Sequence, residues 1–306
     1  MKIFVTGASG WIGSAIVPEL RAAGHEVVGL ARSDASAQKL QAAGASVYRG
    51  DLNDPDSLAR AAGECDGVIH MAFQHEVAFA GDFLAAGAAD RRAVEAMGAA
   101  LAGSDRPFVL ASGTAGLVQG RPVTENDGLV PSAATRANPA GLRQATALLA
   151  LSLRGIGVRS SVLRLPPTVH GDGDNGFIAT LVGIARQRGD AGYVGDGENR
   201  WAAVHRSDAA RAARLAVESA PAGSVIHAVG EEGIPFRSIA EAMAKGLGVP
   251  STSVAPADAA EHFSFLAHFV ALDSPSSSAI TRELLGWQPS GPALIEDLTQ
   301  SHYYNA

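Results

Sequence analysis

Short apolar runs rich in β-branched residues alternate, along the first half of the chain, with longer stretches rich in alanine. The short runs predict strands at Ile3–Thr6, Glu26–Leu30, Ser46–Arg49, Gly67–Met71, Pro107–Ser112 and Val158–Leu165. The alanine-rich stretches predict helices at Trp11–Ala23, Ser36–Ala43, Asp56–Ala62, Asp82–Gly103 and Ala140–Arg154. This alternation is typical of βαβ units, so the pattern predicts an α/β fold with a doubly wound parallel (Rossmann) sheet.

After Pro166-Pro167 the regular alternation of predicted strands and helices ends. Turns rich in glycine and aspartate and shorter helical stretches follow. We therefore expect a dinucleotide-binding domain over residues 1–165 and a smaller C-terminal substrate lobe over 166–306. Segments near 201–229 are expected to return to the first domain.

The turn between the first strand and the first helix carries three glycines with separate physical roles. Gly7 permits a tight turn, and Gly10 lets a pyrophosphate approach the backbone. Gly13 lets the helix pack close to the sheet and direct its first amides at the anion. Because a strand precedes this turn and βαβ units follow it, the sequence predicts a dinucleotide site.

Composition narrows the classes of partner. The chain has 306 residues, 24 Lys and Arg against 31 Asp and Glu, and a net charge of −7 without a basic block. We therefore do not expect nucleic acid or a membrane as a partner. The expected partner is a small-molecule substrate. The single cysteine, Cys65, excludes an internal disulfide and any multi-cysteine zinc site; with no metal-ligand motif elsewhere, no metal is predicted. A strand-like run begins at once at Met1, so we expect no signal peptide and a cytoplasmic protein.

Several motifs, in order, resemble those of the extended short-chain dehydrogenase/reductase superfamily. They are Thr6-Gly7-Ala8-Ser9-Gly10-Trp11-Ile12-Gly13, Gly50-Asp51-Leu52, His70-Met71-Ala72, the run from Arg164 to Gly171, Gly195-Asp196-Gly197 and the run from Val204 to Asp208. The resemblance implies a nicotinamide dinucleotide contacted by Gly7, Gly10, Trp11, Ile12, Gly13, Asp51, Leu52, Met71, Ala72, Pro166, Thr168 and Val169.

The end of the second predicted strand bears on which dinucleotide is bound. A carboxylate there suits the ribose hydroxyl of NAD, whereas an arginine accommodates the 2′-phosphate of NADP. Arg32 and Ser33 occupy this place, so NADP(H) is preferred. Asp34 follows directly and keeps NAD(H) as the alternative.

The resemblance also implies a Tyr-x-x-x-Lys acid pair, which this chain lacks. Its tyrosines are Tyr48, Tyr193, Tyr303 and Tyr304, and its lysines are Lys2, Lys39 and Lys245. The expected places fall near Arg136 and Ala140, so the chain resembles an atypical branch. Ser112 and Thr114 match the family's carbonyl-polarising cluster. His170 is the candidate proton donor, with His75, Arg136 and His205 as further candidates at the same edge.

We therefore expect an atypical NADPH-dependent reductase that transfers hydride to a small carbonyl or imine. An iminium substrate would need no strong proton donor, which makes the lost tyrosine chemically intelligible. A non-catalytic NADP(H)-binding sensor or scaffold is the alternative, and a sugar-nucleotide epimerase is disfavoured. The two long alanine-rich helices also allow a homodimer face.

Overall fold

A seven-stranded parallel sheet forms the centre of the computed structural model, which describes residues 1–130 and 139–305. Its strand order is β10-β6-β5-β4-β1-β2-β3. The strands are β1 Lys2–Thr6, β2 Glu26–Ala31, β3 Ser46–Arg49, β4 Gly67–His70, β5 Pro107–Gly113, β6 Arg159–Leu165 and β10 Ser224–His227. The predicted doubly wound fold is confirmed.

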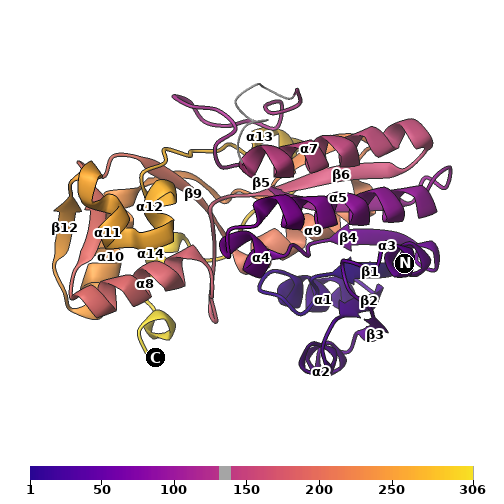
Figure 1. Ribbon diagram of the computed structural model, residues 1–306, viewed down its shortest axis with the longest axis horizontal. Helices are drawn as coiled ribbons and strands as arrows, with labels where there is room; N and C mark the ends of the chain where they lie inside the picture. The colour runs from indigo at the N-terminus through magenta and orange to yellow at the C-terminus, as the bar shows by residue number, and fades with distance from the viewer. Residues whose placement is uncertain (131–138, 306) are drawn as a thin grey trace.

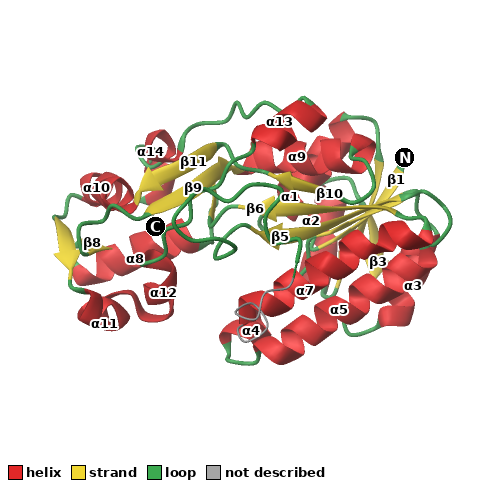
Figure 2. Ribbon diagram, turned by 90° about the horizontal axis from the view of Figure 1, so that it is seen from above, coloured by secondary structure: helices red, strands yellow, loops and turns green. Residues whose placement is uncertain are grey.

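Helices cover both faces of this sheet (Figure 2). One face carries α1 Gly13–Ala22, α2 Asp34–Ala42 and α9 Arg206–Ser219. The other carries α3 Pro55–Gly63, α5 Phe83–Ala100 and α7 Pro139–Ser152. The short helix α4 His75–Phe79 precedes α5, and the 3-10 turn Leu153–Ile156 follows α7. Each face buries its own apolar cluster against the strands, so the sheet is buried on both sides, as parallel sheets require.

A second, smaller lobe lies at the other end of the molecule from the central sheet (Figure 1, left). One of its sheets joins β7 Thr168–His170, β9 Arg200–His205 and β11 Glu231–Pro235, and another pairs β8 Ala191–Val194 with β12 Ser251–Val254. Its helices are α8 Phe177–Arg188, α10 Phe236–Leu247, α11 Ala259–Phe263, α12 Ala267–Val270 and α14 Leu294–Asp297, with 3-10 turns at Pro256–Asp258, Ser264–Leu266 and Ser301–Tyr303. Its apolar core gathers around Trp201 and Phe236.

The chain crosses between the two lobes more than once. After β9 it returns as α9 and β10, and β10 pairs with β6 at the edge of the central sheet. Helix α13 Ala279–Leu285 packs against β10 and α9, before α14 re-enters the second lobe. In the described ranges, no helix has both the length and the apolar character needed to cross a bilayer.

Candidate active site

A pocket of about 1080 Å³ opens at the carboxyl ends of the parallel strands, where doubly wound sheets bind ligands. Every residue predicted to contact the cofactor lines it. They are Gly7, Gly10, Trp11, Ile12, Gly13, Arg32, Ser33, Asp51, Leu52, Met71, Ala72, Pro166, Thr168 and Val169. Phe177 and Phe265 of the second lobe complete the wall, so both lobes build the pocket.

The glycine turn has the close packing that a dinucleotide cradle needs. Gly7 has φ +66°, and a Cβ there would lie 2.8 Å from the amide nitrogen of Ala72. A Cβ at Gly13 would collide with the carbonyl oxygen of Gly7. Helix α1 starts directly after the turn, and Gly10, Trp11, Ile12 and Gly13 line the pocket at its N-terminal end. The amides of Ser14 and Ala15 already bond to the carbonyl oxygens of Gly10 and Ile12, at 2.9 Å each. The turn therefore fits the pyrophosphate of a dinucleotide.

Trp11 ties this turn to strand β7. Its indole Nε1 donates a hydrogen bond to the carbonyl oxygen of Val169 at 2.9 Å. The guanidinium of Arg206 stacks on the Trp11 ring at 4.3 Å and donates a hydrogen bond to the Ser14 hydroxyl. The glycine turn and β7 are thereby held together, although they are far apart in sequence.

Arg32 and Ser33 line the pocket beyond β2, where the ribose of a dinucleotide would lie. The Arg32 side chain is 68% exposed, and the exposed Glu76 carboxylate lies 3.8 Å from its Nη2. Asp34 lines a separate hollow, where its exposed carboxylate accepts a 2.5 Å hydrogen bond from Arg49. The pocket thus presents a cation and a hydroxyl here.

Ser112 and Thr114 differ in position although both lie at the carboxyl end of β5. Ser112, near the end of β5, lines the pocket. Thr114 lies beyond the strand, is fully buried and does not line the pocket. Its amide bonds to the carbonyl oxygen of Leu165 at 3.0 Å, which continues the pairing of β5 with β6 by one residue. Of the two hydroxyls, only that of Ser112 is placed to meet a substrate.

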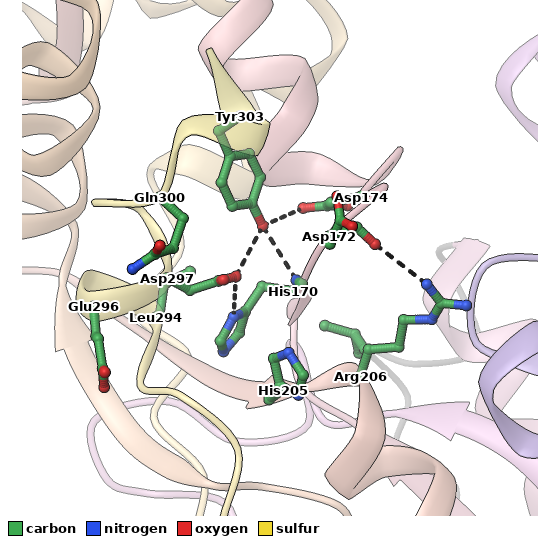
Figure 3. Close-up of polar contacts among 12 residues, drawn as sticks. His170, Asp172, Asp174, His205, Arg206, Leu294, Glu296, Asp297, Gln300 and Tyr303 are labelled. Atoms are coloured by element: carbon green, nitrogen blue, oxygen red, sulfur yellow. Dashed lines mark hydrogen bonds and ion pairs between the residues drawn. The ribbon is translucent and has the colours of Figure 1, made fainter. Parts of the chain in front are cut away.

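The structure does not bring His170 to the pocket. Its ring is fully buried between the lobes, with Nδ1 2.8 Å from Asp297 of α14. The hydroxyl of Tyr303 lies 3.1 Å from Asp174 and 3.4 Å from the same Asp297 oxygen (Figure 3). Burial raises the pKa values of Asp174 and Tyr303. His170 therefore belongs to a cluster that fastens the C-terminal segment, rather than to the candidate reaction centre.

The other proton-donor candidates differ in whether they line the pocket. His205 lies beside His170, with ring centroids 5.5 Å apart, and does not line the pocket. Arg136 falls outside the described residues. His75, at the start of α4, does line the pocket, and burial together with the charge of Arg143 lowers its pKa.

Arg143 is a charged pocket residue that the sequence analysis missed. It projects from α7, and its Nη2 donates to the carbonyl oxygen of Ala111 at 2.8 Å. Its Nη1 bonds to buried Asp90 at 2.7 Å, and Phe73 stacks on its guanidinium at 4.4 Å. Arg143 is one of two arginines in the predicted Ala140–Arg154 helix, and the sequence could not single it out because its partner Asp90 lies on another helix.

The model of the NAD dependent epimerase/dehydratase family matches residues 3–229. The chain belongs to this family. A protein of Schizosaccharomyces pombe is 45% identical over 304 residues, covering 99% of this chain and all of the relative. A farnesyl-dihydroquinoline-oxide ketoreductase of Stigmatella aurantiaca is 29% identical over 252 residues, 81% of this chain and 74% of that protein. The resemblance to the extended short-chain dehydrogenase/reductase superfamily is confirmed.

Solved structures of the family share the architecture. The dTDP-glucose 4,6-dehydratase of Streptomyces venezuelae, solved with NAD bound, aligns with a TM-score of 0.78 at 22% identity. The alignment covers 99% of this chain and 97% of that one. A nucleotide cofactor is therefore consistent with the fold and with the pocket's lining.

Proposed function

We propose that the protein is an NADPH-dependent reductase of a small carbonyl or imine compound. The observation that carries this proposal is the continuity of the pocket. It runs from the cation Arg32, through the glycine turn, to the hydroxyl of Ser112. The ketoreductase relative supports the same class of reaction.

Different residues along this pocket would bind different parts of the cofactor. The glycine turn and the start of α1 would hold the pyrophosphate, while Arg32 and Ser33 would hold the 2′-phosphate of NADPH. Pro166 and Thr168 would lie against the nicotinamide. When bound, the reduced nicotinamide supplies a hydride to the carbon of the C=O or C=N group, whose π electrons move to the heteroatom.

Ser112 would then hold the substrate oxygen by donating its hydroxyl proton in a hydrogen bond. One proton must finally reach that oxygen, or an imine nitrogen, to complete the product. His75 and water are the sources that the pocket offers, because the family's tyrosine is absent. The lowered pKa of His75 keeps it neutral near pH 7, so its role as an acid would grow as the pH falls.

One observation favours a second candidate, a binding protein that senses NADP(H) without turning it over. No tyrosine in this chain has a lysine four positions later. A sensor needs the cofactor cradle but no group that polarises a carbonyl.

The substitution Ser112→Ala separates the two candidates. For a reductase, we expect kcat/KM to fall about 100-fold on a panel of ketones, aldehydes and cyclic imines, because one oxyanion donor is lost. The dissociation constant of NADPH, followed by nucleotide fluorescence, should not change. Ser152→Ala, on the exposed side of α7, is the control. A Ser112→Ala protein as active as the wild type, or a wild type without turnover, would count against the reductase.

A further inference from the structure

A buried chain of polar groups runs from the glycine turn to the reactive end of the pocket. The Ala72 amide lies 3.2 Å from Thr6 Oγ1, which lies 2.6 Å from His70 Nδ1. His70 Nε2 lies 3.2 Å from one oxygen of Asp90, and Arg143 Nη1 lies 2.7 Å from the other. The side chains of Thr6, His70 and Asp90 are at most 1% exposed.

Hydrogen bonds and charge link the members of this chain. Thr6 Oγ1 accepts a hydrogen bond from the Ala72 amide and forms a second hydrogen bond with His70 Nδ1. The Nε2 side of the His70 ring faces the carboxylate of Asp90. Burial opposes ionisation of Asp90, yet His70 and Arg143 together bring its pKa below the usual range. Asp90 is therefore a fixed anion at neutral pH.

Arg143 is the end of this chain that reaches the pocket. Its side chain is 25% exposed and lines the cavity. A guanidinium has five N–H donors, and the bonds to Asp90 and to the Ala111 carbonyl use two of them. Ala111 and Ser112 line the same pocket as Arg143, so the guanidinium and the hydroxyl that would hold the substrate oxygen share one cavity.

We propose that Arg143 is a catalytic residue that stabilises the negative charge arising on the substrate oxygen, and that Asp90 and His70 are its positioning residues. This inference rests on the proposed reductase function. In this proposal Arg143 supplies the fixed positive charge at the reactive end of the pocket. The family's lysine is expected at another position of α7, which the aliphatic Ala140 occupies. Arg143 cannot give up a proton at neutral pH, so the proton still comes from His75 or water.

The competing account is a structural ion pair that joins α5 to α7. Removing Arg143 alone would not separate the two accounts, because it would leave Asp90 buried without its cation and could unfold the protein. The double variant Asp90→Asn with Arg143→Met removes both charges at similar side-chain volume. A purely structural pair predicts a folded double variant with wild-type kinetics.

We expect the folded double variant to lose at least 100-fold in kcat on a panel substrate such as 9,10-phenanthrenequinone, with NADPH binding unchanged. Arg143→Lys keeps the charge and should recover part of this loss. The control is Arg91→Met with Glu95→Gln, which removes an exposed ion pair of 2.8 Å on α5 outside the pocket. Wild-type kcat in the double variant would overturn the proposal.

A second readout does not depend on turnover. In the complex with NADP⁺, bound 4-nitrophenol should ionise at a lower pH than the free phenol, because Arg143 and Ser112 would favour its oxyanion. Absorbance of the phenolate reports this shift, and the double variant should abolish it. An unaltered shift in the double variant, or no binding of nitrophenolate to the wild type, would contradict the proposal. An Arg143-dependent shift in a protein that turns over no panel member would retain the oxyanion site and refute the reductase function.

Discussion

Arg32 is the residue on which the cofactor preference depends. Its side chain lines the pocket and is largely exposed, whereas neighbouring Asp34 is engaged by Arg49 and lines a different hollow. An exposed pair with Glu76 contributes little, so the guanidinium can turn to a phosphate at small cost. This arrangement underlies the proposed choice of NADPH over NADH.

The substitution Arg32→Ala should therefore raise the KM for NADPH by roughly 10- to 100-fold, the effect of losing one charge-assisted hydrogen bond. The KM for NADH should change little, since NADH has no 2′-phosphate. Steady-state kinetics with both nucleotides measure this, with the exposed Arg60→Ala on α3 as control. Equal effects on the two nucleotides would remove Arg32 from the phosphate site.

Single residues also show where reasoning from sequence stops. The glycines of the turn could be placed because their spacing reflects backbone geometry within one βαβ unit. His170 could not, because its partner Asp297 is 127 residues away and belongs to the second lobe. Arg143 was missed for the same reason, since Asp90 and Ala111 lie on other elements.

At the scale of elements, the turn between β1 and α1 is the most constrained part of the site. A side chain at Gly13 would collide with the carbonyl oxygen of Gly7, and backbone cannot move aside as a flexible side chain can. The helix would have to shift away from the sheet, taking its first amides away from the anion.

We expect Gly13→Ala to destabilise the protein by about 1–3 kcal/mol and to weaken NADPH binding at least tenfold. Thermal unfolding and nucleotide fluorescence provide the two measurements. Gly63→Ala is the matched control, because a Cβ at this end of α3 would meet nothing within 4 Å. That control should be neutral or stabilise by up to about 1 kcal/mol. Tight NADPH binding by Gly13→Ala would contradict the assigned cradle.

The predicted strands of the central sheet match the observed ones closely because alternation and β-branching are local signals. β3 has its predicted bounds, and β1, β2, β4, β5 and β6 differ by one residue or so at their ends. Helix α2 begins earlier than expected because Ser33 caps it, accepting a hydrogen bond from the Ser36 amide. The long predicted Asp82–Gly103 helix is shorter, and α4 before it went unpredicted.

At the scale of the whole molecule, the sheet gains its seventh strand from a distant segment. β10 is only four residues long and pairs with β6, so local periodicity could not assign its place. The second lobe places Phe177 and Phe265 over the pocket, and this arrangement also depends on contacts between distant segments. The homodimer face on α5 and α7 stays a prediction.

The most direct test of the central claim follows the hydride itself. The protein is incubated with NADPH carrying deuterium on both C4 positions and with a panel of ketones, aldehydes and cyclic imines, and the products are examined by mass spectrometry. A reductase predicts one deuterium on the carbon that bore the C=O or C=N bond, and no product when Ser112→Ala and Asp90→Asn with Arg143→Met are combined. Tight NADPH binding without a labelled product from any panel member would contradict the account and indicate an NADP(H)-binding protein.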